Sequence, residues 1–130
     1  MVRGIRGAIS VNENTSEEIL SGTKELLSEI KAENGFCIED IVSVFFSMTP
    51  DLNAAFPAAA AREMDWTLVP LFGMQEADIV GGLEKCIRIL VQVNCDKNQN
   101  EIKHCYLREA VKLRNDLQEK IDVKQKGEIK

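Results

Sequence analysis

Residues 84–95 of the chain, EKCIRILVQVNC, form the most strongly strand-like stretch of the sequence. Because side chains alternate between the two faces of a strand, one face would carry the four β-branched residues Ile87, Ile89, Val91 and Val93. The opposite face would carry Cys86, Arg88, Leu90 and Gln92. The first face is typical of a strand packed against a core, whereas the second places an arginine in an apolar strand.

The N-terminal segment 2–11, VRGIRGAISV, alternates in the same way and predicts a second strand. Its two faces would hold Arg3, Ile5, Gly7, Ile9 and Val11 on one side, and Val2, Gly4, Arg6, Ala8 and Ser10 on the other. After it, Thr15 and Glu18 have the spacing of a capping box, and apolar residues then recur at helical spacing up to Ile30. Gly35 suits the position that follows a helix C-terminus, so these signals predict one long helix.

Shorter signals complete the pattern along the chain. They predict a buried strand over 41–49, a short helix over 57–64, strands over 68–74 and 102–113, and a turn at 81–82. The order strand, helix, strand, short helix and three strands predicts an α+β fold with a mixed sheet. We expect a single domain over residues 1–117 and a charged, mobile tail over 118–130.

The composition excludes several classes of partner. The 130 residues carry a formal net charge of −5 and no run of Lys or Arg, which argues against nucleic acid or an anionic membrane as partner. The longest apolar run, 54–61, has eight residues and contains Pro57, so it is too short to span a membrane. The four cysteines are widely spaced, which argues against a zinc site. Since the N-terminal segment lacks the apolar centre of a signal peptide, we expect a cytoplasmic protein with reduced thiols.

Arg88 and Arg6 are unusual because each occurs in a predicted strand beside apolar or small neighbours. A buried guanidinium without a partner costs several kcal/mol, so each arginine needs water, a carboxylate or a ligand. Two interpretations remain open. In the first, this sheet face is exposed to solvent, or Glu76 or Glu84 pairs with one arginine. In the second, the arginines hold a small anion in two-point geometry, with Tyr106 as a neutral donor and Glu76 as the one nearby acid.

Most familiar catalytic patterns are missing from the sequence. It contains no Ser/His/Asp set, no glycine-rich phosphate loop and no spacing typical of a metal site. The only histidine, His104, is expected to be exposed on a polar strand. If the protein is an enzyme, its chemistry should therefore need neither a nucleophilic side chain nor a cofactor.

Six sequence blocks, taken in order, resemble one family of enzymes. They are RGIRGA at 3–8, TPDLNAAFPAAAAR at 49–62, VPLFGMQE at 69–76, GGLEKCIRIL at 81–90, HCYL at 104–107 and LRNDL at 113–117. Together they resemble the monofunctional chorismate mutases of the trimeric α+β class over residues 3–117, with a one-residue contraction near Asp65 and Trp66. The resemblance implies a ferredoxin-like fold in a homotrimeric pseudo-barrel, with active sites between subunits. It also implies cofactor-free conversion of chorismate to prephenate by an intramolecular Claisen rearrangement, in phenylalanine and tyrosine biosynthesis.

The resemblance also implies roles for individual residues. Arg88 would contact the ether oxygen and a carboxylate of the enolpyruvyl arm, Arg6 and Tyr106 would hold the same arm, and Glu76 would accept a hydrogen bond from the ring hydroxyl. The other substrate-binding residues would be Phe56 and Ala58 from a neighbouring subunit, Arg62 and Arg114 near the outer ring carboxylate, and Leu71, Phe72, Gly73 and Leu113 along the pocket.

Three positions depart from the family pattern. Ala59 stands where Lys is common, Gly73 where Cys is common, and Asn115 where Pro is common. None of them is among the four predicted catalytic residues, so we expect activity to survive with weaker substrate binding. The alternative hypothesis is a trimeric binding or regulatory protein that keeps the anion site without catalysis.

Overall fold

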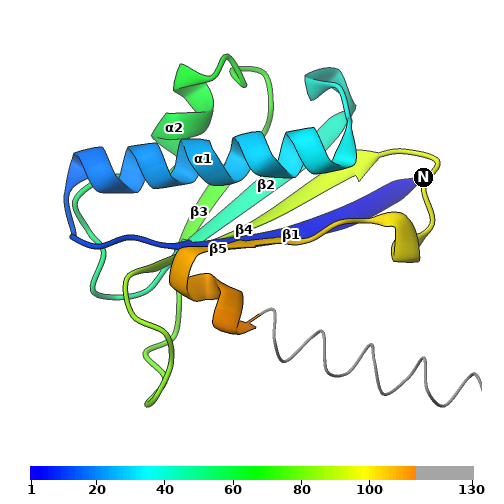
Figure 1. The fold of residues 1–130 in the computed structure, drawn as a ribbon. Helices are drawn as coiled ribbons and strands as arrows, with labels where there is room; N and C mark the ends of the chain where they lie inside the picture. The colour runs from blue at the N-terminus through cyan, green and yellow to red at the C-terminus, as the bar shows by residue number, and fades with distance from the viewer. Residues whose placement is uncertain (114–130) are drawn as a thin grey trace, which may run out of the picture.

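The protein is built on a mixed sheet of five strands, with two helices packed on one face (Figure 1). The computed structural model describes residues 1–113. Along the chain the main elements are β1 (Val2–Ser10), α1 (Ser16–Asn34), β2 (Ile41–Met48), α2 (Ala58–Glu63), β3 (Leu71–Gln75), β4 (Cys86–Asn94) and β5 (Cys105–Leu107). Short 3-10 helices occupy Ile38–Asp40, Gln99–Glu101 and Arg108–Ala110. The predicted α+β class and the predicted order of the main elements are confirmed.

The strand-like stretch that contains Arg88 forms β4, at the centre of the sheet order β3-β2-β4-β1-β5. β4 runs antiparallel to both β1 and β2. β1 and β2 are therefore parallel to each other and are joined through α1, with β4 inserted between them, which is the split β-α-β arrangement of ferredoxin-like folds. β3 and β5 extend the sheet at its two edges, each parallel to its neighbour.

The main core lies between α1 and the sheet. The alternate residues of β4 over 87–93 are buried, as their β-branched pattern predicts. Gly7 allows α1 to approach β1 closely, because a Cβ at this position would lie only 2.7 Å from Cδ1 of Ile30. Trp66 is almost completely buried and contacts Phe36 edge to face, with ring centroids 6.5 Å apart.

Both ends of α1 follow the predicted signals. At the N-terminus, Oγ1 of Thr15 accepts a hydrogen bond from the Glu18 N–H at 3.1 Å. In a complete capping box, the Glu18 side chain would also accept a hydrogen bond from the Thr15 N–H. Instead, the Glu18 carboxylate forms an ion pair with Arg108 at 3.9 Å. At the C-terminus, Gly35 adopts a left-handed φ of 65°, and its N–H donates to the Lys31 carbonyl oxygen at 2.8 Å.

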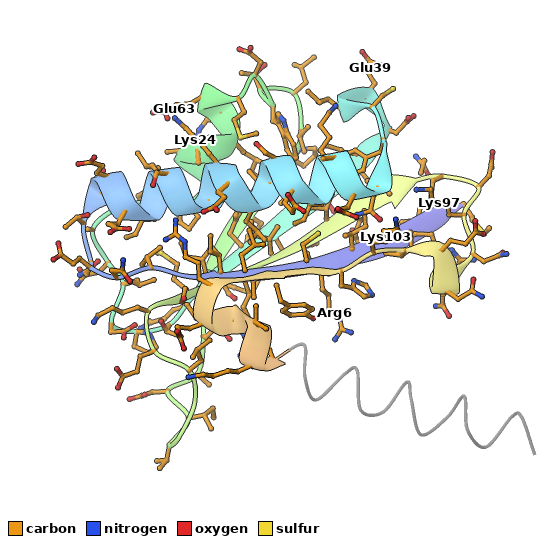
Figure 2. All side chains as sticks on the ribbon, in the orientation of Figure 1. Arg6, Lys24, Glu39, Glu63, Lys97 and Lys103 are labelled. Atoms are coloured by element: carbon orange, nitrogen blue, oxygen red, sulfur yellow. The ribbon has the colours of Figure 1, made fainter. Side chains whose placement is uncertain are left out.

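The two helices lie on the same side of the sheet (Figure 1). An ion pair between Lys24 of α1 and Glu63 of α2 connects them (Figure 2). Over residues 1–113, no helix is both long and apolar enough to cross a membrane.

The last predicted strand is wrong in length. The sequence predicts a strand over 102–113, but β5 spans only Cys105–Leu107. Arg108 ends the strand because its φ of 55° leaves the extended region, and its guanidinium contacts Glu25 at 2.8 Å and the Ser10 carbonyl oxygen at 3.3 Å. The predicted domain end at 117 and the predicted tail over 118–130 lie outside the described residues.

Candidate active site

The sheet face opposite the two helices carries a shallow hollow of about 470 Å³. All five strands contribute to its lining, which includes Arg6, Phe45, Met74, Arg88, Leu90 and Tyr106. Figure 2 shows the Arg6 side chain projecting from the sheet on the side away from α1. Strand alternation predicts that Arg6 and Arg88 share a face, and both of them line this hollow.

Arg88 and Glu76 form an ion pair, with Nε of Arg88 3.0 Å from Oε1 of Glu76. The Glu76 N–H donates to the Met48 carbonyl oxygen at 2.9 Å, which fixes this residue just beyond the end of β3. The second carboxylate oxygen, Oε2, is buried and has no hydrogen-bond partner among residues 1–113. The sequence left Glu76 and Glu84 as possible partners of a strand arginine, and Glu76 is the one that pairs. Its second oxygen can still accept a hydrogen bond.

A polar network that was missed from the sequence holds the start of β4. The Cys86 N–H donates to Oγ1 of Thr49 at 3.0 Å, and the Lys85 N–H donates to Oδ2 of Asp51 at 2.9 Å. These bonds fix the backbone just before Arg88. The available signal was the Thr-Pro-Asp turn after β2, because Thr and Asp side chains often bond to backbone N–H groups in turns.

The Cys86 thiol is fully buried and lies close enough to Arg88 and Glu76 to feel both charges. Its burial, offset only in part by the Arg88 guanidinium, raises its pKa to about 11. The thiol is therefore neutral at pH 7. It packs in a buried cluster with Ala8 and Tyr106 and is not suited to act as a nucleophile.

His104 differs from the sequence prediction of an exposed side chain. Its ring is partly buried, and its Nδ1 accepts a hydrogen bond from the Arg6 N–H at 2.9 Å. Burial, and then the nearby Arg6 guanidinium, lower the pKa of His104 from its ordinary value of 6.5. Tyr106 follows on β5, is 9% exposed and packs with Ala8 and Cys86. The β1–β5 edge thus holds Arg6 and Tyr106 at the same hollow.

The β3 candidates divide between the two faces of the sheet. Phe72 shares its face with Met74, which lines the hollow, and its ring contacts that of Phe45 with centroids 6.3 Å apart. Alternation directs Leu71 and Gly73 to the opposite face, where Leu71 packs against the core. A Cβ added at Gly73 would meet nothing within 4 Å, so packing does not require glycine there.

The candidates around α2 lie apart from the hollow. Phe56 precedes α2 and is 76% exposed, while Ala58 and Arg62 belong to this helix, on the side of the sheet that α1 also covers (Figure 1). None of the three lines the hollow that contains Arg88. Leu113 packs against the buried cluster that includes Tyr106, and Arg114 lies outside the described residues. The chain by itself thus brings together the four predicted catalytic residues, but it leaves Phe56, Ala58 and Arg62 elsewhere.

The charges at this hollow are suited to a small anion. Two guanidinium groups can bind carboxylates in two-point geometry, and a phenol can add a neutral donor. In the part of the chain that is described, no cluster of His, Cys, Asp and Glu side chains could hold a metal ion. The arrangement can therefore bind a dianion and place a cation beside an oxygen that gains negative charge.

Sequence and structure comparisons agree on one family. The model of the family Chorismate mutase type I matches residues 2–117. The chain is 52% identical over 118 residues to the chorismate mutase AroH of Bacillus subtilis (strain 168), covering 90% of this chain and 93% of that protein. It is 47% identical over 119 residues to the chorismate mutase AroH of Thermus thermophilus, covering 91% of this chain and 98% of that protein. A solved chorismate mutase from Clostridium thermocellum superposes with a TM-score of 0.82 at 50% identity, covering 83% of this chain and 96% of that one.

Proposed function

The chain belongs to the chorismate mutase type I family and is an isomerase that converts chorismate to prephenate, and we propose that Arg88, Glu76, Arg6 and Tyr106 are its catalytic residues. The observation that carries this assignment is the Arg88–Glu76 ion pair, at 3.0 Å, beside a hollow that Arg6 and Tyr106 also line. The reaction belongs to the biosynthesis of phenylalanine and tyrosine.

The rearrangement breaks one C–O bond and forms one C–C bond within a single molecule. No proton or electron passes to the protein, so the chemistry needs neither a nucleophilic side chain nor a cofactor. The protein can instead select the compact conformer of the substrate and stabilise the charge that develops in the transition state. Binding both carboxylates of chorismate selects that conformer, and guanidinium groups are the side chains best suited to do so.

Arg88 is suited to the ether oxygen of the substrate. This oxygen gains negative charge as its C–O bond lengthens, and a fixed cation beside it acts where the charge grows. The planar guanidinium can serve the ether oxygen and a carboxylate of the enolpyruvyl arm together, which an ammonium group cannot do with the same geometry. Because Glu76 contacts Nε, the two Nη groups at the end of the fork can face the substrate.

Glu76 is suited to the substrate ring. Its buried Oε2 has no partner within the described residues, and the ring hydroxyl of chorismate is a donor that would satisfy it. Its negative charge would also favour the positive charge that builds on the ring as the C–O bond breaks. Arg6 and Tyr106, at the β1–β5 edge, would hold the enolpyruvyl arm in place.

The active enzyme, in this proposal, is a homotrimeric pseudo-barrel with its sites between subunits. Two observations support it. On the edge strand β3, the large apolar side chains of Phe72 and Met74 are 61% and 47% exposed on the face that carries the site. In addition, Phe56, Ala58 and Arg62 lie away from the hollow of their own protomer, so they can serve the hollow of a neighbour in a cyclic assembly.

The other candidates would complete the pocket in this assembly. Phe56 and Ala58 would border the ring, Arg62 and Arg114 would bind the outer carboxylate, and Phe72 and Leu113 would form the remaining walls. Leu71 and Gly73 point to the opposite face, so they would contribute backbone groups only. We place the catalytic domain at residues 1–117, followed by a charged tail over 118–130. We also propose that the enzyme is cytoplasmic. The net charge of −5 supports the absence of nucleic-acid or anionic-membrane partners.

The activity can be tested directly. Pure protein should lower the ultraviolet absorbance of chorismate and yield prephenate without an added cofactor. Saturable binding of chorismate by calorimetry without turnover would instead support a non-catalytic binding protein, an alternative that the family match and the intact Arg88–Glu76 pair do not favour.

Sites shared between subunits can be tested with Arg88→Ala and Arg62→Ala, each expected to be impaired alone. Refolding equal amounts together should produce mixed trimers in which about one site in four keeps both arginines. Recovery of about a quarter of the wild-type rate at low substrate would support a site between subunits. A rate no higher than the mean of the two separate variants would contradict it, and sedimentation would verify that trimers form.

A further inference from the structure

We propose that His104 is a positioning residue for Arg6, and that full substrate affinity requires its neutral ring to accept the Arg6 backbone N–H. This inference rests on the proposed role of Arg6 in holding the enolpyruvyl arm. In this proposal, His104 affects the substrate through Arg6, and substrate binding depends on whether the His104 ring is protonated.

The contact fills a position that the sheet leaves without a backbone partner. β5 pairs with β1 in parallel from Cys105 and Gly7 onward, so the Arg6 N–H lies just before the first paired residue. There the His104 ring replaces a backbone carbonyl group, with its Nδ1 2.9 Å from the Arg6 nitrogen. Without the ring, the Arg6 N–H would have to bond to water, and this part of β1 would lose a connection to the β5 side.

The position of the Arg6 guanidinium depends strongly on its backbone. Its same-face neighbours on β1, Gly4 and Ala8, are too small to hold a long side chain in one orientation. Within residues 1–113 the guanidinium also forms no ion pair. A shift of the backbone at Arg6 would therefore move its charge relative to Arg88 across the hollow.

Only one protonation state of His104 can make this contact. Nδ1 accepts when the proton is on Nε2, whereas both nitrogens of the charged ring are donors. Three neighbouring groups could affect the protonation of this ring. From β1, the charge of Arg6 acts on it directly. Along the chain, Tyr106 is the neighbour on β5, whereas Lys103 forms an ion pair with Glu33 of α1 at 3.8 Å. Burial and then Arg6 lower the pKa of His104, so the bond is present at pH 7 and is lost as the pH falls through that lowered value. The charged ring would also repel the adjacent guanidinium.

The ring can be observed directly, because His104 is the only histidine in the chain. NMR of the imidazole in the intact enzyme should report the Nε2–H tautomer at pH 7.5 and a titration midpoint below 6.5. The KM for chorismate should rise through the same midpoint as the pH falls. An Nδ1–H tautomer, or a KM that does not follow this titration, would overturn the proposal.

Two substitutions separate the hydrogen bond from the bulk of the ring. His104→Leu removes the acceptor, whereas His104→Asn keeps an oxygen near the position of Nδ1 and cannot titrate. We expect His104→Leu to raise KM about three- to tenfold at pH 7.5 with kcat changed less than about twofold, as for the loss of one hydrogen bond. His104→Asn should recover most of that affinity and show a flat KM between pH 5 and 7. Equal KM values for the two variants, or a wild-type pH profile in His104→Asn, would contradict the inference.

Arg6→Ala distinguishes failure of this inference from failure of the proposed function. If Arg6 binds substrate, Arg6→Ala raises KM by itself, and adding His104→Leu then has little further effect. An unchanged KM in Arg6→Ala would remove the proposed role of Arg6. A raised KM in Arg6→Ala together with an unchanged KM in His104→Leu would leave the proposed function standing and refute the positioning role.

Discussion

Replacing Arg88 with alanine should remove most of the catalysis and leave the fold intact. The substitution deletes the guanidinium whose Nε contacts Glu76 at 3.0 Å and whose outer nitrogens can face the substrate. The Arg88 side chain is 47% exposed, but Glu76 is only 21% exposed and would keep a largely buried carboxylate without its cation, so the loss should cost about 1–3 kcal/mol of stability. Catalysis and stability are therefore expected to respond very differently.

The expected loss of activity follows from the role of the cation. Removing one preorganised donor to a developing negative charge typically lowers kcat about 10²–10³-fold, or about 3–4 kcal/mol in activation free energy. Because Arg88 carries a full charge and can serve two substrate oxygens, we expect a loss of about 10³-fold in kcat/KM. A stability change of about 1–3 kcal/mol would lower Tm by roughly 5–15 °C and leave the protein folded at the assay temperature.

The assay measures the initial rate of chorismate consumption, with Tm by circular dichroism and assembly by sedimentation. Arg3→Ala is the matched control. Nε of Arg3 donates to the Lys97 carbonyl oxygen at 2.9 Å, and the Arg3 side chain does not line the hollow. It should change kcat/KM by less than about twofold. Arg88→Lys should fall between wild type and Arg88→Ala, because it keeps the charge without the fork. Near-native turnover by folded Arg88→Ala protein would refute the reasoning.

Three further predictions concern packing and thiol chemistry. Gly7→Ala should lower the free energy of unfolding by about 1–3 kcal/mol in urea titrations, because the new Cβ would lie 2.7 Å from Cδ1 of Ile30, and an unchanged midpoint would contradict this packing. Gly73→Ala should raise stability by about 0.5–1 kcal/mol, because a Cβ there meets nothing within 4 Å; a lower Tm would show that glycine is required. At pH 8 iodoacetamide should modify the exposed Cys37 well before the buried Cys86, whose pKa of about 11 keeps it protonated at that pH. Peptide mass mapping measures both thiols, and early modification of Cys86 would oppose the prediction.

Most elements of the fold could be predicted because alternation and helical spacing are local properties of the chain. β1, β4 and α1 occupy the segments that their apolar periodicity indicates. β3 begins at Leu71 and not at 68 as predicted. β5 departs most from its prediction, since nothing local marks Arg108 as the end of a strand. Its φ of 55° accompanies contacts to Glu25 and Ser10, which lie 83 and 98 positions away in the sequence. Contacts of this kind leave no periodic signal.

The candidate site could be predicted in part for the same reason. Strand alternation by itself assigns Arg6 and Arg88 to one face, and the family resemblance identifies Glu76 and Tyr106 beside them. The support provided by Thr49 to the start of β4 was missed, because it depends on which turn meets which strand end.

The sequence by itself determined the class of fold, the faces of the central strands and the family, because periodicity and ordered motifs are written along the chain. Only the tertiary structure decided which groups meet. It paired Arg88 with Glu76 and not with Glu84, and it brought His104 to the Arg6 backbone across 98 positions. The physical reason is that such contacts depend on strand order and register, which the packing of the whole sheet against α1 sets and no local pattern contains.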